Sequence, residues 1–478
     1  MELTFVDKIR WQCRLRPDEP ALALPSPENE IVTYGQFETC LNNVCRTLDA
    51  MGVVPGGIYA LLVNNALLHL ALSLALEELG AATMAVYDLN LPKKWPFTAV
   101  LTDRAVSNAA WPVVHVDTDW LRGDGKPPAV PGSRVRSIDD ACRVVLTSGS
   151  TGIPKGVVFS HRAWAHRVAH FDYLFGELAT LKRLMCCVVN SEYRTCVYAL
   201  SKGAMYCFPE SSVESTAKKI AFYKVQFLSA SGTTLGTILS VPHPDRKDFA
   251  SLELIRTFGS PLTSRLAGAV RHTMCNRLIA EYGSAETGTI AAGWAETLDL
   301  DSGEVGYVVP GTKIDVVDSG TRSLLSSGSG TLRIRSVAMA SGYLAGDTSK
   351  SFEGDAFYTN DIGSVSPDGK VTLHGRTTSV INLGGDKATI EGIEMHYARS
   401  PGVRELAAAP VRDKLGVTKL VAVIVPNEEW SEPMFWTHLR KNIPRTFLPV
   451  KLVMVDDLPK GTNGKVDRAK LGSLVAAA

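Results

Sequence analysis

The sequence predicts an α/β fold: a large N-terminal domain of α/β layers with a β-rich subdomain, followed by a small α+β C-terminal domain. Apolar strand-like runs alternate with helical segments up to about residue 260, and short β-rich runs follow after about residue 300. With 45% hydrophobic and 21% charged residues among 478, the composition is typical of a folded globular protein of two to four compact units.

The segment from Ile58 to Val86 shows the α/β pattern most clearly. An apolar run at 58–63 is followed by a helical segment at 66–79 and by a second apolar run at 83–86. The helical segment is too short to span a membrane and ends in two glutamates, so we expect a helix packed on a sheet.

After about residue 300 the residue pattern changes from alternating strand and helix segments to short β-rich runs. The runs GEVGYVVPG at 303–311 and KVTLHG at 370–375 indicate a β-rich, antiparallel unit. From Arg376 onward the chain carries both signs of charge and one apolar run, LVAVIVP at 420–426. We therefore expect two domains, 1–375 and 376–478.

Charge and cysteine content narrow the function classes. Fifty Lys+Arg against 49 Asp+Glu leave a net charge of +1, which argues against nucleic acid or a membrane as a partner. The nine cysteines form no CxxC pair, and their odd number is typical of reduced thiols. The first residues contain no apolar signal-peptide core, so we expect a cytoplasmic protein.

A loop suited to a phosphate follows a predicted strand. Residues 144–156 read VVLTSGSTGIPKG, in which glycines allow close backbone approach and hydroxyls and a lysine donate to an anion. The pattern differs from the P-loop motif because a proline precedes the lysine and a glycine follows it. A plain surface turn is the alternative for such a loop. The candidate ligands of the phosphates are Thr147, Ser148, Gly149, Ser150, Thr151, Gly152 and Lys155.

This loop resembles the [ST]SG[ST]TGxPKG signature of the adenylate-forming superfamily, which includes acyl-CoA synthetases, peptide-synthetase adenylation domains and luciferases. Further segments follow in that superfamily's order: TFGSPL at 257–262, EYGSAETG at 281–288, YTNDIG at 358–363 and PKGTNGKVDR at 459–468. The resemblance implies a mobile C-terminal domain and the cofactors ATP, Mg²⁺ and coenzyme A.

The resemblance also implies a role for each nucleotide-binding segment. Residues 259–261 would flank the adenine, with Tyr282 close to it, and Glu286 would hold Mg²⁺. Asp361 and Arg376 would reach the ribose. Ala285 stands where many members have a threonine that contacts the α-phosphate. The residues implied in nucleotide binding by these segments are Gly259, Ser260, Pro261, Tyr282, Gly283, Ser284, Ala285, Asp361 and Arg376.

By the same resemblance, Lys465 would enter the active site and stabilise charge on the α-phosphoryl group and the attacking carboxylate. Taken alone, a lysine in a Gly/Asn turn is solvent-exposed. The expected hinge departs from the superfamily pattern at Thr378 and Ser379, and Gly384 and Gly385 match glycines that line a pantetheine tunnel.

The expected acyl pocket matches the superfamily least well. Amino-acid-activating relatives have an aspartate where Asn190 stands, and a buried ammonium needs a carboxylate partner, so an α-amino acid is disfavoured although Glu192 lies nearby. Polar candidates point to a small polar or aromatic acid, and helix caps are the alternative reading for them. The candidate pocket residues are Asn190, Ser191, Tyr193, Arg194 and Ser231.

We therefore expect an AMP-forming acid–thiol ligase that activates a small-molecule carboxylic acid and transfers it to coenzyme A, with Lys465 and Glu286 as its catalytic residues. Coenzyme A is favoured because the chain carries no carrier domain of its own. The first alternative is a free-standing enzyme that loads an acyl or peptidyl carrier protein. A luciferase-type oxygenase and an inactive nucleotide-binding module are the remaining alternatives.

Overall fold

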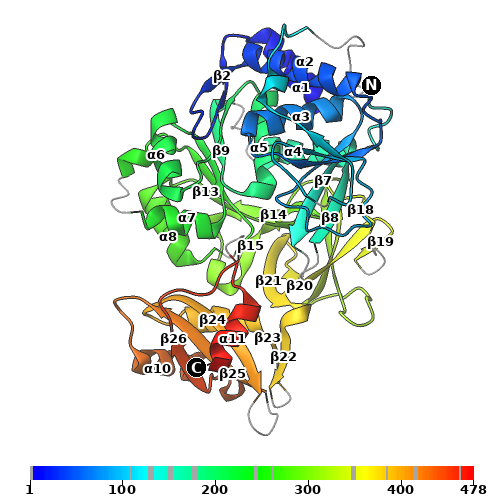
Figure 1. The fold of residues 1–478 in the computed structure, drawn as a ribbon. Coiled ribbons are helices and arrows are strands. Elements are labelled where there is room, and N and C mark those ends of the chain that lie inside the picture. Colours follow the sequence, from blue (N-terminus) through cyan, green and yellow to red (C-terminus); the bar gives the residue numbers. More distant parts are fainter. Residues whose placement is uncertain are drawn as a thin grey trace.

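The computed structural model describes residues 4–107, 109–126, 134–148, 154–174, 176, 180–241, 246–260, 262–345, 351–383, 386–412, 418–461 and 465–477. Two sheets and the helices around them form residues 4–376, here called the large region. Residues 380–477 form the C-terminal unit, which lies at the lower end of Figure 1. The mixed α/β fold that the sequence predicts is confirmed.

One sheet of the large region has seven strands in the order β18-β8-β7-β4-β3-β5-β6. Strands β3, β4, β5, β6 and β7 are parallel wherever they pair, whereas β8 runs antiparallel to β7. The bounds are β3 Ile58–Leu62, β4 Ala82–Ala85, β5 Ala99–Thr102, β6 Val113–His115, β7 Ala141–Ser148, β8 Pro154–Ser160 and β18 Gly342–Tyr343.

The second sheet has fourteen strands, thirteen of them in the order β16-β17-β20-β21-β15-β14-β13-β12-β11-β9-β10-β1-β2, with β19 pairing β20. The bounds are β1 Pro20–Ala23, β2 Ile31–Thr33, β9 Arg183–Cys186, β10 Met205–Cys207, β11 Phe227–Ala230, β12 Leu254–Thr257, β13 Leu278–Ser284, β14 Gly288–Trp294, β15 Glu304–Val308, β16 Thr312–Val317, β17 Gly330–Ser336, β19 Phe352–Glu353, β20 Ala356–Val365 and β21 Lys370–Arg376.

The β-rich segment after residue 300 is therefore not a separate sheet. It continues the α/β sheet through the antiparallel hairpin of β13 and β14, because β15 pairs β14 and β21 pairs β15. The expected antiparallel character is found along this part of the sheet. The physical consequence is that β20 and β21 belong to the same sheet as the parallel strands β12 and β13, whose ends carry predicted nucleotide segments, with β14 and β15 in between (Figure 1).

Helices fill the space between the two sheets and cover their outer faces. The bounds are α1 Phe5–Leu15, α2 Tyr34–Ala50, α3 Ala66–Glu78, α4 His161–Leu174, α5 Val189–Ser201, α6 Val213–Tyr223, α7 Gly232–Leu239 and α8 Ser264–Thr273. The largest core cluster contains residues of α3, α4 and α5 and of strands from both sheets. A second cluster packs α6, α7 and α8 on the outer face of the fourteen-stranded sheet. The helix predicted over 66–79 is α3, and it is buried on most sides.

The C-terminal unit has its own sheets and cores. Its elements are β22 Val380–Leu383, β23 Asp386–Thr389, α9 Ile390–Ala398, β24 Val403–Arg412, β25 Thr418–Pro426, α10 Glu432–Asn442, β26 Lys451–Met454 and α11 Arg468–Ala477. Alternate residues of β25 enter two different cores, Leu420 and Ile424 on one side and Val421 and Val423 on the other. Burial on both faces explains why this strand reads as a continuous apolar run.

Candidate active site

Three residues predicted to bind the nucleotide meet where the Tyr282 side chain of β13 reaches the Asp361–Arg376 pair of β20 and β21. Asp361 and Arg376 are directly opposite in the β20–β21 register, and the Arg376 Nε donates to Asp361 Oδ1 at 3.0 Å. The Tyr282 hydroxyl donates to Asp361 Oδ2 at 2.6 Å. Burial and the nearby Asp361 charge raise the pKa of Tyr282 well above its usual value, so the hydroxyl keeps its proton. The tyrosine therefore orients the carboxylate.

Lys465 of the C-terminal unit belongs to the same site. Partial desolvation lowers the pKa of Lys465, the Arg376 guanidinium lowers it further, and the Asp361 carboxylate raises it. The backbone N–H of Gly461 donates to the Lys465 carbonyl at 2.8 Å and closes the turn that carries the lysine. The two units thus bring Lys465 within electrostatic range of Asp361 and Arg376, 104 and 89 positions away in the sequence.

Glu286 lies beside a tyrosine that the sequence motifs did not identify. The Tyr343 hydroxyl donates to Glu286 Oε1 at 2.8 Å, and the Lys155 ammonium lies 4.6 Å from the centre of the Tyr343 ring. Pairing of β18 with β8 places Tyr343 opposite Val157, two residues after Lys155. A carboxylate, a phenol and a lysine therefore gather at the end of the predicted phosphate loop.

Of the predicted phosphate loop, the structure describes the two flanking strand ends but not residues 149–153. Thr147 pairs with Lys155 in the β7–β8 register, and its hydroxyl donates to the Lys155 carbonyl at 3.3 Å. Ser148 ends β7. The remaining predicted phosphate ligands, Gly149, Ser150, Thr151 and Gly152, lie outside the described residues.

The chemistry of these groups fits ATP with Mg²⁺. Mg²⁺ in nucleotide sites is held by one or two carboxylates together with the phosphates. The Tyr343 hydroxyl bonds Oε1 of Glu286, and the carboxylate keeps further lone pairs with which it could bind a metal. No group of three or more His, Cys, Asp or Glu side chains able to hold a metal occurs within the described part of the chain. A metal bound by Glu286 would therefore depend on the phosphates for its other ligands.

The turn between β13 and β14 carries Ala285 and Glu286. The Ser284 and Thr287 side chains cap each other's backbone N–H groups at 3.2 Å, which closes the turn. Gly283 is required there, because a Cβ at this position would lie 1.9 Å from the Gly288 carbonyl oxygen. The hairpin thus holds the carboxylate of Glu286 next to a rigid, tightly packed backbone.

The segment predicted to flank the adenine follows β12. Gly259 has φ of +83°, a conformation that L side chains rarely adopt, and an added Cβ there would meet nothing within 4 Å. The buried Ser260 hydroxyl has no hydrogen-bond partner among the described residues. Pro261, and Gly384 and Gly385 of the predicted tunnel, lie outside the described residues.

Behind Ala285 lies a set of buried arginines, here called the arginine cluster: Arg167 of α4, Arg194 of α5 and Arg256 of β12. Arg256 donates to Glu281 Oε1 at 2.5 Å, and the Thr289 hydroxyl donates to Glu281 Oε2 at 2.8 Å. These contacts lower the pKa of Glu281 against the opposing effect of burial.

The other two members of the cluster are less well satisfied. Arg167 donates to the Ala285 carbonyl at 2.8 Å, and burial lowers its pKa to about 10. The Nε atoms of Arg167 and Arg194 and both ring nitrogens of His170 are buried without a partner among the described residues. Burial lowers the pKa of His170 to about 4, so its ring is neutral at pH 7.

The remaining predicted pocket residues occupy two different environments. Tyr193 lies under the Arg143 guanidinium, 3.7 Å from ring centre to Cζ, and donates to Glu77 Oε2 at 3.3 Å. The Ser231 hydroxyl accepts from the Thr234 N–H as the N-cap of α7. Asn190 and Ser191 lie in the first turn of α5, and their side chains are outside the described set.

Sequence reasoning missed several residues that this geometry brings together. Arg167 and His170 share one face of α4 with Phe171, and this spacing could have marked a polar group turned toward the core. Glu281 directly precedes the identified Tyr282, and Arg256 precedes the identified glycine of 257–262 by three positions. Tyr343 had no such signal, since only tertiary pairing places it beside Glu286.

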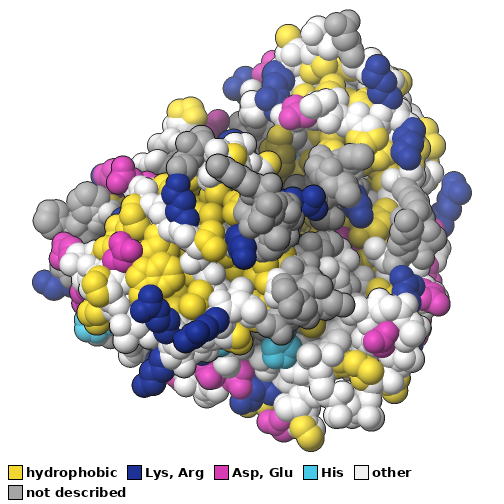
Figure 2. All heavy atoms as spheres, turned by 90° about the horizontal axis from the view of Figure 1, so that it is seen from below, with side chains coloured by type: hydrophobic (Ala, Val, Ile, Leu, Met, Phe, Trp, Pro, Cys, Tyr) yellow, Lys and Arg dark blue, Asp and Glu magenta, His cyan; other side chains and the backbone are white. Residues whose placement is uncertain are grey.

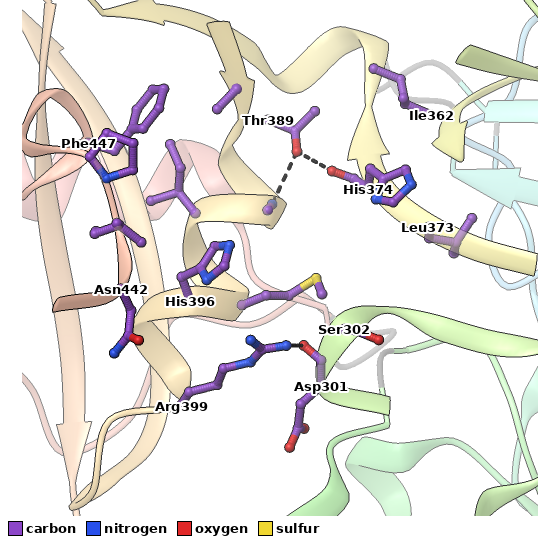
Figure 3. A pocket seen from close by; sticks show the side chains of 16 residues that line it. Asp301, Ser302, Ile362, Leu373, His374, Thr389, His396, Arg399, Asn442 and Phe447 are labelled. Carbon is purple, nitrogen blue, oxygen red and sulfur yellow. Dashed lines mark hydrogen bonds between the residues drawn. The ribbon is translucent and has the colours of Figure 1, made fainter. Parts of the chain in front are cut away.

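A cavity of about 650 Å³ lies between the large region and the C-terminal unit (Figure 3). Thr389 donates to the His374 carbonyl and accepts from the Gly392 N–H, and Arg399, the C-cap of α9, donates to the Asp301 carbonyl. The Thr389–His374 and Arg399–Asp301 bonds tie the two units together on the lining of the cavity.

The surface seen in Figure 2, from below, carries basic, acidic and hydrophobic side chains, and neither charge sign covers it. No described helix has both the length and the hydropathy needed to cross a membrane.

The chain is similar in sequence to enzymes of two kinds, a peptide synthase and a CoA ligase. The chain is 24% identical to bacitracin synthase 1 of Bacillus licheniformis over 486 residues, which is 97% of this chain and 9% of that protein. It therefore spans only a small part of this synthase. It is also 24% identical to 4-coumarate–CoA ligase 5 of Oryza sativa subsp. japonica, covering 96% of this chain and 92% of the ligase.

Solved structures share the whole fold. ATP-bound MatB from Rhodopseudomonas palustris superposes with a TM-score of 0.82 at 21% identity, over 98% of both chains. The amide bond synthetase McbA from Marinactinospora thermotolerans superposes with a TM-score of 0.82 at 19% identity, over 98% of this chain and 99% of that one. At these identities the likeness establishes the fold alone.

Two family matches cover most of the chain in the order of the two units. Residues 9–344 match the family described as AMP-binding enzyme, and residues 392–465 match the AMP-binding enzyme C-terminal domain. The first match includes Lys155, Glu286 and Tyr343, and the second ends at Lys465. The chain with this geometry is thus a member of the AMP-binding enzyme family, within the adenylate-forming superfamily.

Proposed function

We propose that this chain activates a carboxylic acid with ATP and then transfers the acyl group to the thiol of coenzyme A. The observation that carries the proposal is the hydrogen-bonded group of Tyr282, Asp361 and Arg376, with Lys465 of the other unit within electrostatic range of it. The proposal takes residues 1–375 as an adenylation domain and residues 376–478 as a mobile domain that delivers this lysine.

In the first step an oxygen of the substrate carboxylate attacks the α-phosphorus. A P–O bond to the acid forms, the bond between the α-phosphorus and the bridging oxygen breaks, and pyrophosphate leaves. Lys465, as a positioned cation, stabilises the negative charge on the α-phosphoryl oxygens. Asp361, oriented by Tyr282 and Arg376, has lone pairs left to accept the ribose hydroxyls.

Glu286 and Lys155 act at the phosphates. Glu286 would hold Mg²⁺, which supplies charge neutralisation on the phosphates when bound. The Tyr343 hydroxyl, from β18 of the seven-stranded sheet, holds the Glu286 carboxylate in place. The buried Ser260 hydroxyl, which has no partner among the described residues, is a donor for the adenine.

In the second step the thiol sulfur attacks the acyl carbon and AMP leaves, with the thiol proton passing to solvent. Coenzyme A is supported by the similarity to a CoA ligase over nearly its whole length. A carrier-protein thiol is the second candidate, supported by the similarity to bacitracin synthase 1, a far longer synthase of which this chain matches one part. We propose a small polar or aromatic acid as the substrate.

The test is ATP–pyrophosphate exchange measured over a panel of acids. Exchange with at least one acid is expected, and exchange with none would contradict adenylation. Lys465→Ala should abolish exchange, while a preformed acyl-adenylate should still react with thiol. Lys460→Ala is the matched control, because Lys460 lies in the same turn but pairs with Glu405 at 2.7 Å. Adding coenzyme A or a carrier protein then identifies the acceptor.

A further inference from the structure

The arginine cluster has more positive charge than its neighbours balance. Arg256 has Glu281 as a direct partner, and Arg167 has the Ala285 carbonyl and lies within range of Glu286. Arg194 has no ion pair with any described residue, although it is only 5% exposed. It therefore differs from the other two members.

The electrostatic surroundings of Arg194 oppose its charge. Besides burial, Arg256 and Arg167 lower the pKa of Arg194, and the attraction of Glu281 is weaker than the repulsion from either arginine. The contact of the guanidinium with the Phe171 ring, 5.2 Å from its centre, compensates only in part. A buried guanidinium in such surroundings lacks an anion.

The nearest carboxylate in the sequence does not fill this role. Glu192 lies two residues before Arg194 on α5, and burial alone raises its pKa to about 7. No ion pair joins the two side chains, as far as the described residues show. No described carboxylate therefore forms an ion pair with Arg194, and a ligand carboxylate could supply one.

The position of Arg194 relates it to the site of adenylation. Arg167 bonds the backbone of Ala285, next to Glu286, while Arg256 bonds Glu281, next to Tyr282. Arg194 and Arg256 contact the same Phe171 ring, with their Cζ atoms 5.2 and 5.0 Å from its centre, so Arg194 belongs to the cluster that supports this turn. An acid that reacts at that turn and extends to the Phe171 ring would reach Arg194.

We propose that the substrate acid carries a second carboxylate and that Arg194 binds it. A carboxylate supplies two acceptor oxygens in the geometry of the guanidinium fork, and the buried Nε of Arg194 is one of the donors it would satisfy. The neutral His170 beside the cluster, with both ring nitrogens unpartnered among the described residues, adds a further donor. This inference rests on the proposed function and specifies its substrate class as dicarboxylic acids.

The test compares matched acids in ATP–pyrophosphate exchange. The pairs are the linear dicarboxylates from malonate to adipate with the monocarboxylates of equal chain length, and isophthalate and terephthalate with benzoate. We expect kcat/KM for at least one dicarboxylate to exceed that of its monocarboxylate partner by about 100-fold or more. Equal or higher values for every monocarboxylate would overturn the inference, as expected if only water or an inorganic anion occupies the cluster.

Variants of Arg194 assign the effect to this side chain. Arg194→Met should remove about 100-fold of the dicarboxylate preference, measured as the ratio of kcat/KM within each matched pair, and Arg194→Lys should retain part of it. Lys202→Met is the matched control, because Lys202 follows the end of α5 and pairs with Asp172 on the surface. An unchanged preference in Arg194→Met would overturn the inference.

Failure of the proposed function can be told apart from failure of the inference about Arg194. If no acid supports exchange, isothermal titration calorimetry with the same dicarboxylates decides between the outcomes. Binding to the wild-type chain that weakens about 100-fold in Arg194→Met supports the second-carboxylate site even without adenylation. Binding that is absent, or equal in both proteins, rejects it.

Discussion

Two buried arginines of the large region differ in how fully their neighbours satisfy them. Arg10 of α1 donates from Nε and Nη2 to Glu78 of α3 at 3.0 and 2.6 Å, and from Nη1 to Asn42 of α2 at 2.8 Å. Arg194 of α5 is as deeply buried, yet its Nε has no partner within the described structure and it pairs with no carboxylate there.

The difference separates an arginine that stabilises the fold, Arg10, from one whose charge a ligand would balance, Arg194. Arg10 joins three helices far from the nucleotide segments, and all of its bonds are made within the fold. Arg194 belongs to the cluster that supports the turn of Glu286 and lacks the anion that burial demands. Unsatisfied buried groups in a native protein call for a physical explanation, and a ligand supplies one here.

The largest effect is expected from breaking the satisfied pair. Glu78→Gln leaves the buried Arg10 charge with only the longer pair to Glu38, so the free energy of unfolding should fall by about 3 kcal/mol, measured from the urea midpoint. Exchange activity of the folded protein should not change. Glu38→Gln is the control, because Glu38 is 3.9 Å from Arg10 and more exposed. Equal losses from the two variants would contradict the assignment.

For Arg194 we expect the substitution to change the free energy of unfolding in the opposite direction. Arg194→Met removes a buried charge that pairs with no described carboxylate, and we expect stability to rise by about 2 kcal/mol, seen as a higher melting temperature without ligand. Arg256→Met should instead destabilise, because it strands the Glu281 carboxylate. If both variants lose stability alike, Arg194 is a structural residue like Arg10.

A smaller effect on activity is expected at Tyr343. Tyr343→Phe keeps the ring near Lys155 but removes the hydrogen bond to Glu286, so exchange should slow roughly tenfold, about 1.4 kcal/mol. Tyr307→Phe serves as a control, since Tyr307 is an exposed tyrosine of β15. An effect of the same size in both variants would remove Tyr343 from the site.

The smallest effect concerns pH. The folded-state pKa of Glu192 is raised to about 7, so its contribution to stability is present below its unfolded pKa of about 4.5 and is lost as pH rises through 7. Because Glu192 is only partly buried, the loss should be about 1 kcal/mol between pH 4.5 and 7. Glu192→Gln should flatten this part of the stability profile, and an unchanged slope would show that another group titrates.

The sequence identified the groups that belong to contiguous motifs. Asp361, Arg376, Glu286 and Lys465 were predicted because each lies in a short segment with a recognisable order of residues. The helix at 66–78 and the doubly buried strand β25 were likewise visible in local apolar patterns. Local patterns are set by neighbours in the chain, and those neighbours are all that a sequence displays.

What joins these groups was not predictable in the same way. Tyr282 reaches Asp361 across 79 positions, Tyr343 reaches Glu286 across 57, and Arg167 reaches Ala285 across 118. The β-rich segment was expected as a unit of its own, but its pairing through β15 to β14 made it part of the large sheet. Such pairings depend on which surfaces pack together and not on adjacent residues.

By itself, the sequence determined the α/β class and the order of the nucleotide motifs, including the lysine near the end of the chain, because periodicity and contiguous chemistry are local properties. Only the tertiary structure decided that this lysine lies near Asp361, that a tyrosine holds Glu286, and that one arginine is buried without a counter-charge in the described part of the chain. These are properties of distance and burial, which arise when sheets and helices pack and bring distant residues into a medium where an unpaired charge is costly.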